Sequence, residues 1–428
     1  MPHVRPHAYA LPNGLRVVHH RRVPEGLACV GVHYGVGFRS EPRGRSGFAH
    51  LFEHLMFQGS ASVAPAEHFS VIQGSGGSVN ASTRQDYTEY YQCAPESALE
   101  RMLFLESDRM YAPKFTEQNL RTQLGVVREE IRRNILDRPF GGFPWIDLPA
   151  VMYRDFSNAH NGYGDLGDLA RATVADCAAF FDAHYTPSNA VLTVVADLSE
   201  ECVAGMVERH FGPIPARDRA AEPDLAEPPP HTPLFHDAVE ERTRLYATAV
   251  GLRLPPFRTD PLGYAAHVVL AGMLTGTAPG GLAAAAARQR VPLSAVKVQC
   301  GFFGPFDARA PEPLVVTLHH DGHDPRHLAA FVHRELAALA CAGPRTDHLD
   351  RAVRRLRTGW ARRHADPLQH ARSLGAFTLL HARPALVAEV PALLARVDAA
   401  DVAVAAARLM AQAPAVLTVG PERRGGTA

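Results

Sequence analysis

The sequence predicts an α+β protein built from two homologous halves, each a mixed or antiparallel β-sheet packed with helices. The first observation is a repeat, because Ala190-Val-Leu-Thr-Val194 recurs letter for letter as Ala415-Val-Leu-Thr-Val419, 225 residues later. The pair Ala175-Asp176 recurs at the same offset as Ala400-Asp401, so one helix–strand unit is present twice without a gap. The second observation is the Pro- and charge-rich stretch 213–233, which is typical of a linker between two pieces of domain size.

The expected elements follow in order along the chain. Alternating patterns predict strands over 8–11, 14–20 and 28–34, with a hairpin turn at Pro12-Asn13-Gly14. A helix around 47–59 is followed by a strand over Ser78–Tyr91, by helices over 95–110, 116–134 and 174–184, and by a strand over 190–196. After the linker, a strand over 245–252 starts a similar succession. We therefore expect an N-terminal half over 1–215, a linker over 216–236 and a C-terminal half over 237–428.

The composition excludes several classes of function. The formal net charge is zero, so electrostatics give no support for binding to nucleic acid or to a membrane surface. The chain has no run of about 20 apolar residues, and no apolar signal-peptide core follows Met1. The six cysteines form no Cys-x-x-Cys pair, which is typical of reduced thiols rather than of a Cys-rich zinc site. We therefore expect a soluble, cytoplasmic protein.

The segment Gly47–Gly59 contains a candidate metal site. Its centre, His50-Leu-Phe-Glu53-His54, places two imidazoles and a carboxylate on one helical face, because residues three and four apart are neighbours on a helix. The surrounding residues, such as Phe48 and Leu51, are almost all apolar, so the helix is expected to be buried. Buried polar groups are costly unless they are paired or bind a metal. This favours a metal site over a helix that carries two of the 23 histidines by chance.

The two histidines need a third partner, because a catalytic zinc usually takes three protein ligands and keeps one position open. Geometry alone does not choose among the carboxylates of the first half. The helix expected over 116–134 is attractive because it carries carboxylates beside apolar positions. The candidates are Glu89, Glu106, Glu117, Glu129 and Glu130.

Several segments together resemble the pitrilysin/insulinase family of zinc metallopeptidases, in the branch of the mitochondrial processing peptidase. Gly47–Phe57 matches the family's metal helix with its inverted His-x-x-Glu-His motif, and Leu11–Leu15 resembles its opening turn. Gly76–Thr83 resembles the strand that receives substrate, Leu105–Met110 a helix end, and Val126–Ile131 the stretch with the distal metal ligand. The resemblance spans both halves and implies a clamshell dimer, in which two chains face each other around a closed chamber.

The resemblance also implies a zinc-dependent endopeptidase with one zinc ion per chain. Glu53 would be the general base that activates a zinc-bound water. Gln123 would orient Glu130 or a histidine by hydrogen bonding. The family's spacing from the second histidine favours Glu130 over its neighbour, so the expected zinc ligands are His50, His54 and Glu130.

The strand expected over Ser78–Tyr91 is implied to bind substrate. An extended peptide adds to an exposed strand through main-chain hydrogen bonds. Ala81 would give room for the substrate backbone, Asn80 would offer its side-chain amide to a substrate carbonyl, and Ser82 is a third candidate. The expected substrate is a peptide, a leader segment or a presequence.

One departure from the family concerns the partner. Active members also use an Arg and a later Tyr from the second half, whereas this chain has Arg288 but Ala295 at the Tyr position. We therefore expect a heterodimer with a homologous chain that lacks His-x-x-Glu-His and supplies the Arg and Tyr. One alternative is a homodimer that uses Tyr185, Tyr246 or another residue. The other is a non-catalytic assembly subunit of the same fold, against which the intact metal motif argues.

Overall fold

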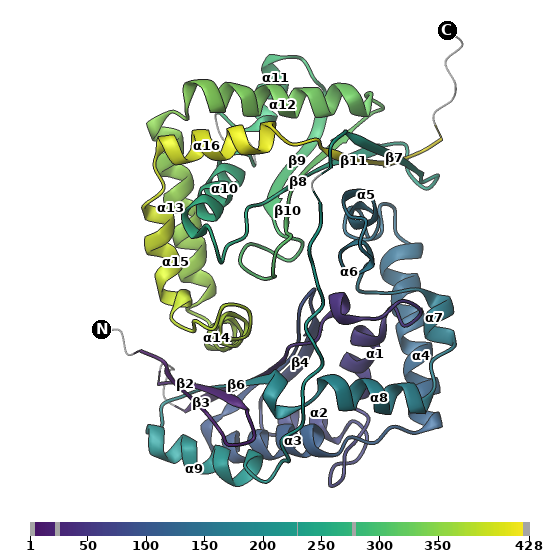
Figure 1. Ribbon diagram of the computed structural model, residues 1–428, viewed down its shortest axis with the longest axis vertical. Coiled ribbons are helices and arrows are strands. Elements are labelled where there is room, and N and C mark those ends of the chain that lie inside the picture. The colour runs from purple at the N-terminus through teal and green to yellow at the C-terminus, as the bar shows by residue number, and fades with distance from the viewer. Residues whose placement is uncertain (1–4, 22–25, 229, 276–279, 423–428) are drawn as a thin grey trace. The chain divides into compact units, whose positions relative to one another are not determined.

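The computed structural model describes residues 5–21, 26–228, 230–275 and 280–422 (Figure 1). Its strands are β1 (His7–Ala10), β2 (Arg16–His20), β3 (Leu27–Tyr34), β4 (Ser78–Thr83), β5 (Thr88–Pro95), β6 (Ala190–Ala196), β7 (Leu234–Val239), β8 (Tyr246–Arg253), β9 (Leu293–Cys300), β10 (Pro313–His320) and β11 (Ala415–Gly420). They form one sheet in the order β1-β2-β6-β3-β5-β4 and another in the order β7-β11-β8-β10-β9.

Helices connect the strands and cover the sheets. Those that precede β7 are α1 (Phe48–Leu55), α2 (Glu67–Gly74), α3 (Leu99–Tyr111), α4 (Glu117–Ile131), α5 (Leu148–Met152), α6 (Phe156–Ala159), α7 (Leu166–Ala170), α8 (Val174–His184) and α9 (Glu200–Phe211). Those that follow are α10 (Pro261–Leu274), α11 (Leu282–Arg288), α12 (Pro325–Ala342), α13 (Thr346–Arg363), α14 (Pro367–His381), α15 (Leu386–Ala395) and α16 (Ala399–Met410). The expected helix 174–184 and strand 190–196 are confirmed to the residue.

The two sheets share one internal arrangement, which confirms the predicted duplication. In the first sheet β2 lies parallel to β6, and β6, β3, β5 and β4 pair antiparallel in that order. In the second sheet β7 lies parallel to β11, and β11, β8, β10 and β9 pair antiparallel in the same way. Strands β5 and β10 begin 225 residues apart, at Thr88 and Pro313, which is the offset of the sequence repeat. Both sheets are therefore mixed, as predicted.

Each compact unit also contains a segment from the other half of the sequence. The first unit comprises residues 1–129, 162–223 and 361–389, and the second unit comprises residues 130–161, 224–360 and 390–428. Helix α14 accordingly packs on β3, β5 and β6 of the first sheet, while α5 packs on β7, β8 and β11 of the second sheet. The described residues of the expected linker, 216–236, form no helix or strand before β7 begins at Leu234.

An ion pair with a buried carboxylate fixes α14 to the first sheet. Arg372 donates to both carboxylate oxygens of Glu89 on β5, with N–O distances of 2.5 and 3.1 Å, and its guanidinium carbon lies 3.9 Å from the centroid of the Tyr91 ring. The His33 Nε2 lies 3.2 Å from the same carboxylate. Burial alone would raise the pKa of Glu89, but the contacts of its carboxylate with His33 and Arg372 lower it to about 2.

Glycines allow close packing of α14 and α5, the helices that the two units receive from the other half of the sequence, on their sheets. A Cβ atom on Gly375 of α14 would lie 2.2 Å from the ring of His33 in the first sheet. In the second unit, a Cβ atom on Gly251 of β8 would lie 2.5 Å from the Met152 sulfur of α5. No larger residue fits at either position without displacing its neighbour, so the close packing of α14 and α5 on their sheets requires glycine there.

The single strand predicted over Ser78–Tyr91 is wrong. The chain reverses at residues 84–87, and β4 pairs with β5 in an antiparallel hairpin. The backbone N–H of Phe38 donates to the carbonyl of Arg84, and the buried side chains of Arg39 and Asp86 lie 3.4 Å apart. The turn contains no Gly or Pro, which explains why the sequence pattern alone predicts one uninterrupted strand. Because β4 pairs only with β5, it forms an edge of the sheet.

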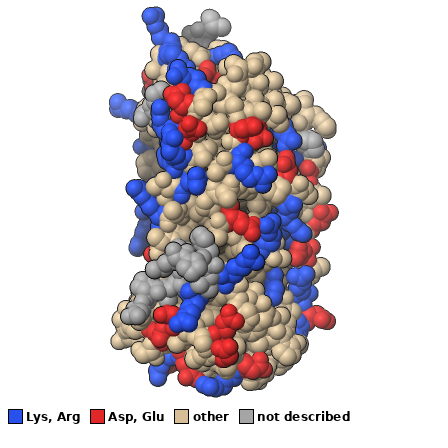
Figure 2. All heavy atoms as spheres, turned by 90° about the vertical axis from the view of Figure 1, so that its left-hand side faces the viewer, with Lys and Arg blue, Asp and Glu red and all other residues tan. Residues whose placement is uncertain are grey.

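The surface carries charges of both signs. Figure 2 shows Lys and Arg side chains interspersed with Asp and Glu side chains on one face, in keeping with the net charge of zero. Within the described residues, no single helix is long and apolar enough to cross a membrane, although the bent pair α14 and α15 reaches that length and composition when counted together.

The ion pair between Arg372 and Glu89 predicts a large effect of one substitution on stability. In Arg372→Met the Glu89 carboxylate stays buried without its bidentate partner, a loss that typically costs about 3–5 kcal/mol. We expect denaturant unfolding to show a decrease of this size. Arg383→Met is the matched control, because it breaks an exposed pair with Glu389 in the same segment and should cost less than about 1 kcal/mol. Equal losses in the two variants would contradict the structural role of Arg372.

The lowered pKa of Glu89 predicts a dependence of stability on pH. Its value falls from 4.5 to about 2 on folding, so the folded state binds this proton less tightly than the unfolded state. The stabilisation is therefore present above about pH 4.5 and is lost as the pH falls toward 2. We expect the difference in unfolding free energy between wild type and Arg372→Met to shrink over this interval in urea titrations. The titrations cover pH 6 to pH 2 in steps of roughly one unit. A difference in unfolding free energy that stays constant over this range would contradict the assignment of the lowered pKa to Glu89.

Candidate metal centre

A carboxylate and two glycines fix the N-terminus of α1. Glu41 accepts hydrogen bonds from the backbone N–H groups of Gly47 at 2.8 Å and Ala49 at 2.7 Å, which satisfies donors that a helix start leaves unpaired. Gly47 has a φ of +92°, and a Cβ atom there would lie 2.9 Å from the carbonyl oxygen of Tyr163. A Cβ atom on Gly164 would lie 2.3 Å from the Gly47 backbone. The loop at 163–164 therefore packs directly on the start of α1.

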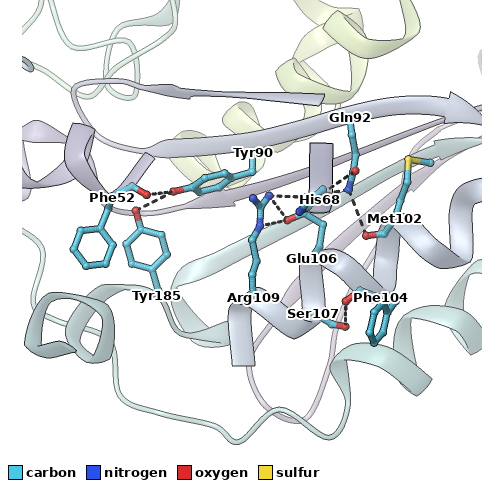
Figure 3. Close-up of polar contacts among 10 residues, drawn as sticks. All are labelled: Phe52, His68, Tyr90, Gln92, Met102, Phe104, Glu106, Ser107, Arg109 and Tyr185. Atoms are coloured by element: carbon cyan, nitrogen blue, oxygen red, sulfur yellow. Dashed lines mark hydrogen bonds and ion pairs between the residues drawn. The ribbon is translucent and has the colours of Figure 1, made fainter. Parts of the chain in front are cut away.

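A buried polar network connects α1 to the sheet (Figure 3). Arg109 of α3 donates to both carboxylate oxygens of Glu106 at 2.6 to 3.0 Å, and its guanidinium carbon lies 4.1 Å from the centroid of the Tyr90 ring. Tyr90 of β5 donates its hydroxyl hydrogen to the carbonyl of Phe52, at 3.1 Å. This hydrogen bond holds α1 at the turn that contains its two histidines.

Gln92 and His68 extend this network on the side of α2 and α3. Gln92 of β5 donates to Glu106 at 3.0 Å, and the His68 Nε2 lies 3.1 Å from the side-chain oxygen of Gln92. Burial lowers the pKa of His68 to about 3, and burial raises the pKa of Glu106 although Arg109 opposes that change. His68 is therefore neutral at ordinary pH, and the positive charge that Glu106 faces at 2.6 Å belongs to Arg109.

His50, His54 and Glu130 come together at one point. One ligand atom from each of the three side chains lies within 4.8 Å of the other two, and no other such group is found in the described part of the chain. The two histidine rings, one helical turn apart on α1, have centroids 5.0 Å apart at an interplanar angle of 87°. Glu130 is the first residue assigned to the second unit, but it lies in the last turn of α4, which runs without a break from Glu117.

The donor set fits a zinc ion. Two imidazole nitrogens and a carboxylate oxygen form one of the usual three-residue ligand sets of catalytic zinc, which keeps a fourth position open. His50 is buried, with 8% of its surface exposed, whereas His54 and Glu130 are partly exposed. The three residues would therefore hold the ion at a site that is only partly buried.

Two of the other carboxylates that the sequence left open are engaged elsewhere. Glu89 pairs with Arg372, and Glu106 pairs with Arg109. Glu117 lies at the opposite end of α4, and Glu129 is not part of the three-residue group. Glu130 is the carboxylate that meets the two histidines.

Thr83 is a functional candidate that the sequence did not single out. Its hydroxyl donates to the Oε2 atom of Glu53 at 2.7 Å, which restrains this carboxylate. Thr83 ends β4 and lies two residues after Ala81, so both side chains are on one face of the strand. Tyr163 was also not predicted, and its ring packs edge-on against His50 at 5.3 Å between centroids.

The expected substrate-binding residues lie on the edge strand β4. Asn80 is exposed, Ala81 is buried and Ser82 is partly exposed. The side-chain oxygen of Asn80 accepts a hydrogen bond from the backbone N–H of Ala81 at 2.9 Å. The Ser82 hydroxyl lies 3.3 Å from the Tyr91 hydroxyl. Their contact with substrate stays a prediction.

The remaining predicted residues are in α4 and in the second unit. Gln123 is buried in α4, two helical turns before Glu130, and its orienting role stays a prediction. Arg288 ends α11 and Ala295 is on β9, both exposed in the second unit.

Tyr185 and Tyr246 are the two tyrosines that the homodimer alternative names in place of the missing family Tyr. Tyr185 is completely buried, and its hydroxyl lies 3.4 Å from the Tyr90 hydroxyl, so Tyr185 is wrong as a substrate-binding residue (Figure 3). Tyr246 on β8 stacks on His320, with an interplanar angle of 14°.

Two protein-family models match the chain. The model described as "Insulinase (Peptidase family M16)" matches residues 16–135, a range that includes α1 and α4. The model described as "Peptidase M16 inactive domain" matches residues 171–356. Together they cover parts of both homologous halves.

Relatives of known name point to the same family. A zinc protease of Helicobacter pylori is 29% identical over 261 residues, which are 58% of this chain and 56% of the relative. A probable β subunit of the mitochondrial-processing peptidase of Arabidopsis thaliana is 26% identical over 201 residues, 47% of this chain and 38% of the relative. The chain thus spans about half the length of the curated relatives that it matches.

Solved structures share the fold. A protease from Helicobacter pylori has a TM-score of 0.85 at 21% identity, covering 97% of this chain and 99% of that chain. The periplasmic protease PqqL from Escherichia coli has a TM-score of 0.75 at 16% identity, covering 98% of this chain and 48% of that chain.

The geometry predicts different effects of two adjacent substitutions on metal binding. Glu130→Gln removes a ligand, so we expect the zinc affinity measured by chelator competition to fall by more than about 100-fold. Mutation of residues that only hydrogen-bond to metal ligands already lowers metal affinity by about 10- to 100-fold. Glu129→Gln is the matched control in the same helical turn and should bind zinc like the wild type. The assignment would be wrong if Glu129→Gln lost the metal and Glu130→Gln kept it.

Proposed function

The chain belongs to peptidase family M16, the insulinase family of zinc proteases, and from this premise we propose that it is a zinc-dependent endopeptidase. Its proposed substrates are peptides or leader and presequence segments, which enter a closed chamber. The observation that carries the proposal is the meeting of His50 and His54 of α1 with Glu130 of α4 within 4.8 Å, where α1 also carries Glu53. A purely structural chain has no need for such a ligand set together with a positioned carboxylate.

The residues of the site divide the work of peptide hydrolysis. When bound, zinc supplies a Lewis acid that polarises the scissile carbonyl and lowers the pKa of water. His50, His54 and Glu130 hold it in place. Glu53 acts as the general base, taking a proton from the attacking water and passing it to the leaving amine. The hydroxyl of Thr83, 2.7 Å away, keeps the Glu53 carboxylate turned toward this position.

The edge strand β4 is the proposed docking site for the substrate main chain. An extended peptide that pairs with β4 as a further strand runs past Asn80, Ala81 and Ser82 toward Thr83, which contacts Glu53. A substrate carbonyl that bonds to the Ala81 N–H takes the place of the Asn80 side-chain oxygen, which frees that amide for a second contact. In this proposal, a peptide bond would pass from the strand edge to the base.

The proposed active assembly is a heterodimer in the cytoplasm. Ala295 has no phenol to offer, so a homologous chain without His-x-x-Glu-His would supply the Arg and Tyr. The match of this chain to 48% of the PqqL protease supports an assembly of two such modules. A homodimer is the alternative, in which a residue other than the buried Tyr185 provides the hydroxyl.

The experiment combines zinc analysis with cleavage of a quenched peptide library. It uses the chain alone, the chain with a co-encoded homologue, and Glu53→Gln in both settings. We expect about one zinc per chain, cleavage only with the homologue, and loss of cleavage but not of zinc in Glu53→Gln. Full activity of the chain alone would contradict the heterodimer. Zinc without cleavage in every mixture would contradict the peptidase and favour the assembly subunit.

The hydrogen bond to Glu53 predicts a role for Thr83 in turnover. Thr83→Val keeps the shape of the side chain but removes the donor, so we expect kcat to fall by about 10- to 100-fold with little change in KM or zinc content. Thr83→Ser is the control that restores the hydroxyl, and it should stay within a few-fold of wild type. A Thr83→Val variant with unchanged kcat would show that the hydroxyl does not position the base.

A further inference from the structure

Cys29 and Cys93 face each other across two central strands of the first sheet. The antiparallel register of β3 and β5 pairs these two residues directly. The Cys29 thiol donates to the Cys93 sulfur, with 2.8 Å between the sulfur atoms. Since a disulfide bond is about 2.05 Å long, a movement of less than about 1 Å joins them.

The two thiols differ in a way that assigns each a step. Cys93 is partly exposed, whereas Cys29 is completely buried. The hydrogen bond from Cys29 lowers the pKa of the Cys93 thiol, against the opposing effects of burial and of Asp366. The same contact, together with burial, raises the pKa of Cys29. Cys93 is thus the thiol that an oxidant reaches and that forms a thiolate more readily, while Cys29 stays protonated beside it.

We propose that Cys29 and Cys93 form a reversible cross-strand disulfide when the chain meets a peroxide. The Cys93 thiolate attacks one peroxide oxygen and displaces hydroxide, which takes up a proton to become water, and leaves Cys93 as a sulfenic acid. The Cys29 thiol then attacks this sulfur and releases a second water as the S–S bond forms. Two thiols are oxidised and one hydrogen peroxide is reduced to two waters. A dithiol reductant restores both thiols by exchange.

The bond would enclose the metal helix in a covalent loop. The two cysteines are 64 residues apart, and α1, α2 and β4 lie between them. Cross-linking a loop of this length restricts the unfolded chain and stabilises the fold. Oxidation would therefore strengthen the first unit around its metal site. The disulfide would form whether or not the chain cleaves peptides.

The test counts thiols in the full-length chain before and after treatment with dilute hydrogen peroxide. After denaturing alkylation and mass spectrometry, we expect the six alkylatable thiols to fall to four. Peptide mapping should recover the Cys29 and Cys93 peptides linked, and dithiothreitol should restore all six thiols. The oxidised chain should also unfold at a higher temperature than the reduced chain.

Three variants make the test specific. Cys93→Ser and Cys29→Ala should each abolish the linked peptide, and Cys93→Ser keeps the test available if the buried Cys29→Ala does not fold. The double variant Cys202→Ser/Cys341→Ser removes the two exposed thiols and should leave the linkage intact. The proposal is overturned if Cys29 and Cys93 both stay alkylatable while Cys202 and Cys341 are oxidised. It is equally overturned if Cys93 is recovered only as a sulfinic acid.

Discussion

The position of α1 is the constraint on which the candidate metal centre depends. This helix has only eight residues, and a short helix has little stability of its own, so its surroundings must hold it. Glu41 and the close packing of Gly164 on Gly47 fix its start, and the Tyr90 hydroxyl fixes the carbonyl of Phe52. Tyr90 in turn packs against Arg109, which pairs with the buried Glu106. The positions of the two α1 histidines therefore depend on the sheet and on α3. A metal ion then requires only that α4 bring Glu130 to the same point.

The same sheet needs a helix from the other half of the chain. Without α14, Glu89 would lose Arg372 and the His33 side of the sheet would be uncovered. The reciprocal placement of α5 on the second sheet follows the same logic, with Met152 packed on Gly251. Because α14 belongs to the unit that carries α1, the duplicated half without the metal motif still completes the metal-bearing unit. This gives a physical reason for the two halves to remain in one chain.

Local patterns in the sequence predict much of this arrangement. The spacing of His50, Glu53 and His54, the repeat at 225 residues and the boundaries of α8 and β6 all follow from short-range regularities. Helix geometry alone does not identify the third metal ligand among the five candidate carboxylates, because that depends on which partner each carboxylate contacts in the folded chain. Arg372 pairs with Glu89, and Arg109 pairs with Glu106. Thr83 was missed for a related reason, since the turn at 84–87 carries no Gly or Pro and hides the end of β4. Once the hairpin is known, strand alternation puts Thr83 on the face of Ala81, toward α1.

The candidate metal centre predicts that His50, His54 and Glu130 hold one zinc ion. The most direct measurement is X-ray absorption at the zinc edge on the zinc-loaded, full-length chain. Two imidazoles and further oxygen ligands at about 2.0–2.2 Å, with no sulfur, are the predicted first shell. A sulfur ligand at about 2.3 Å, or a shell with fewer than two imidazoles, would contradict this ligand set.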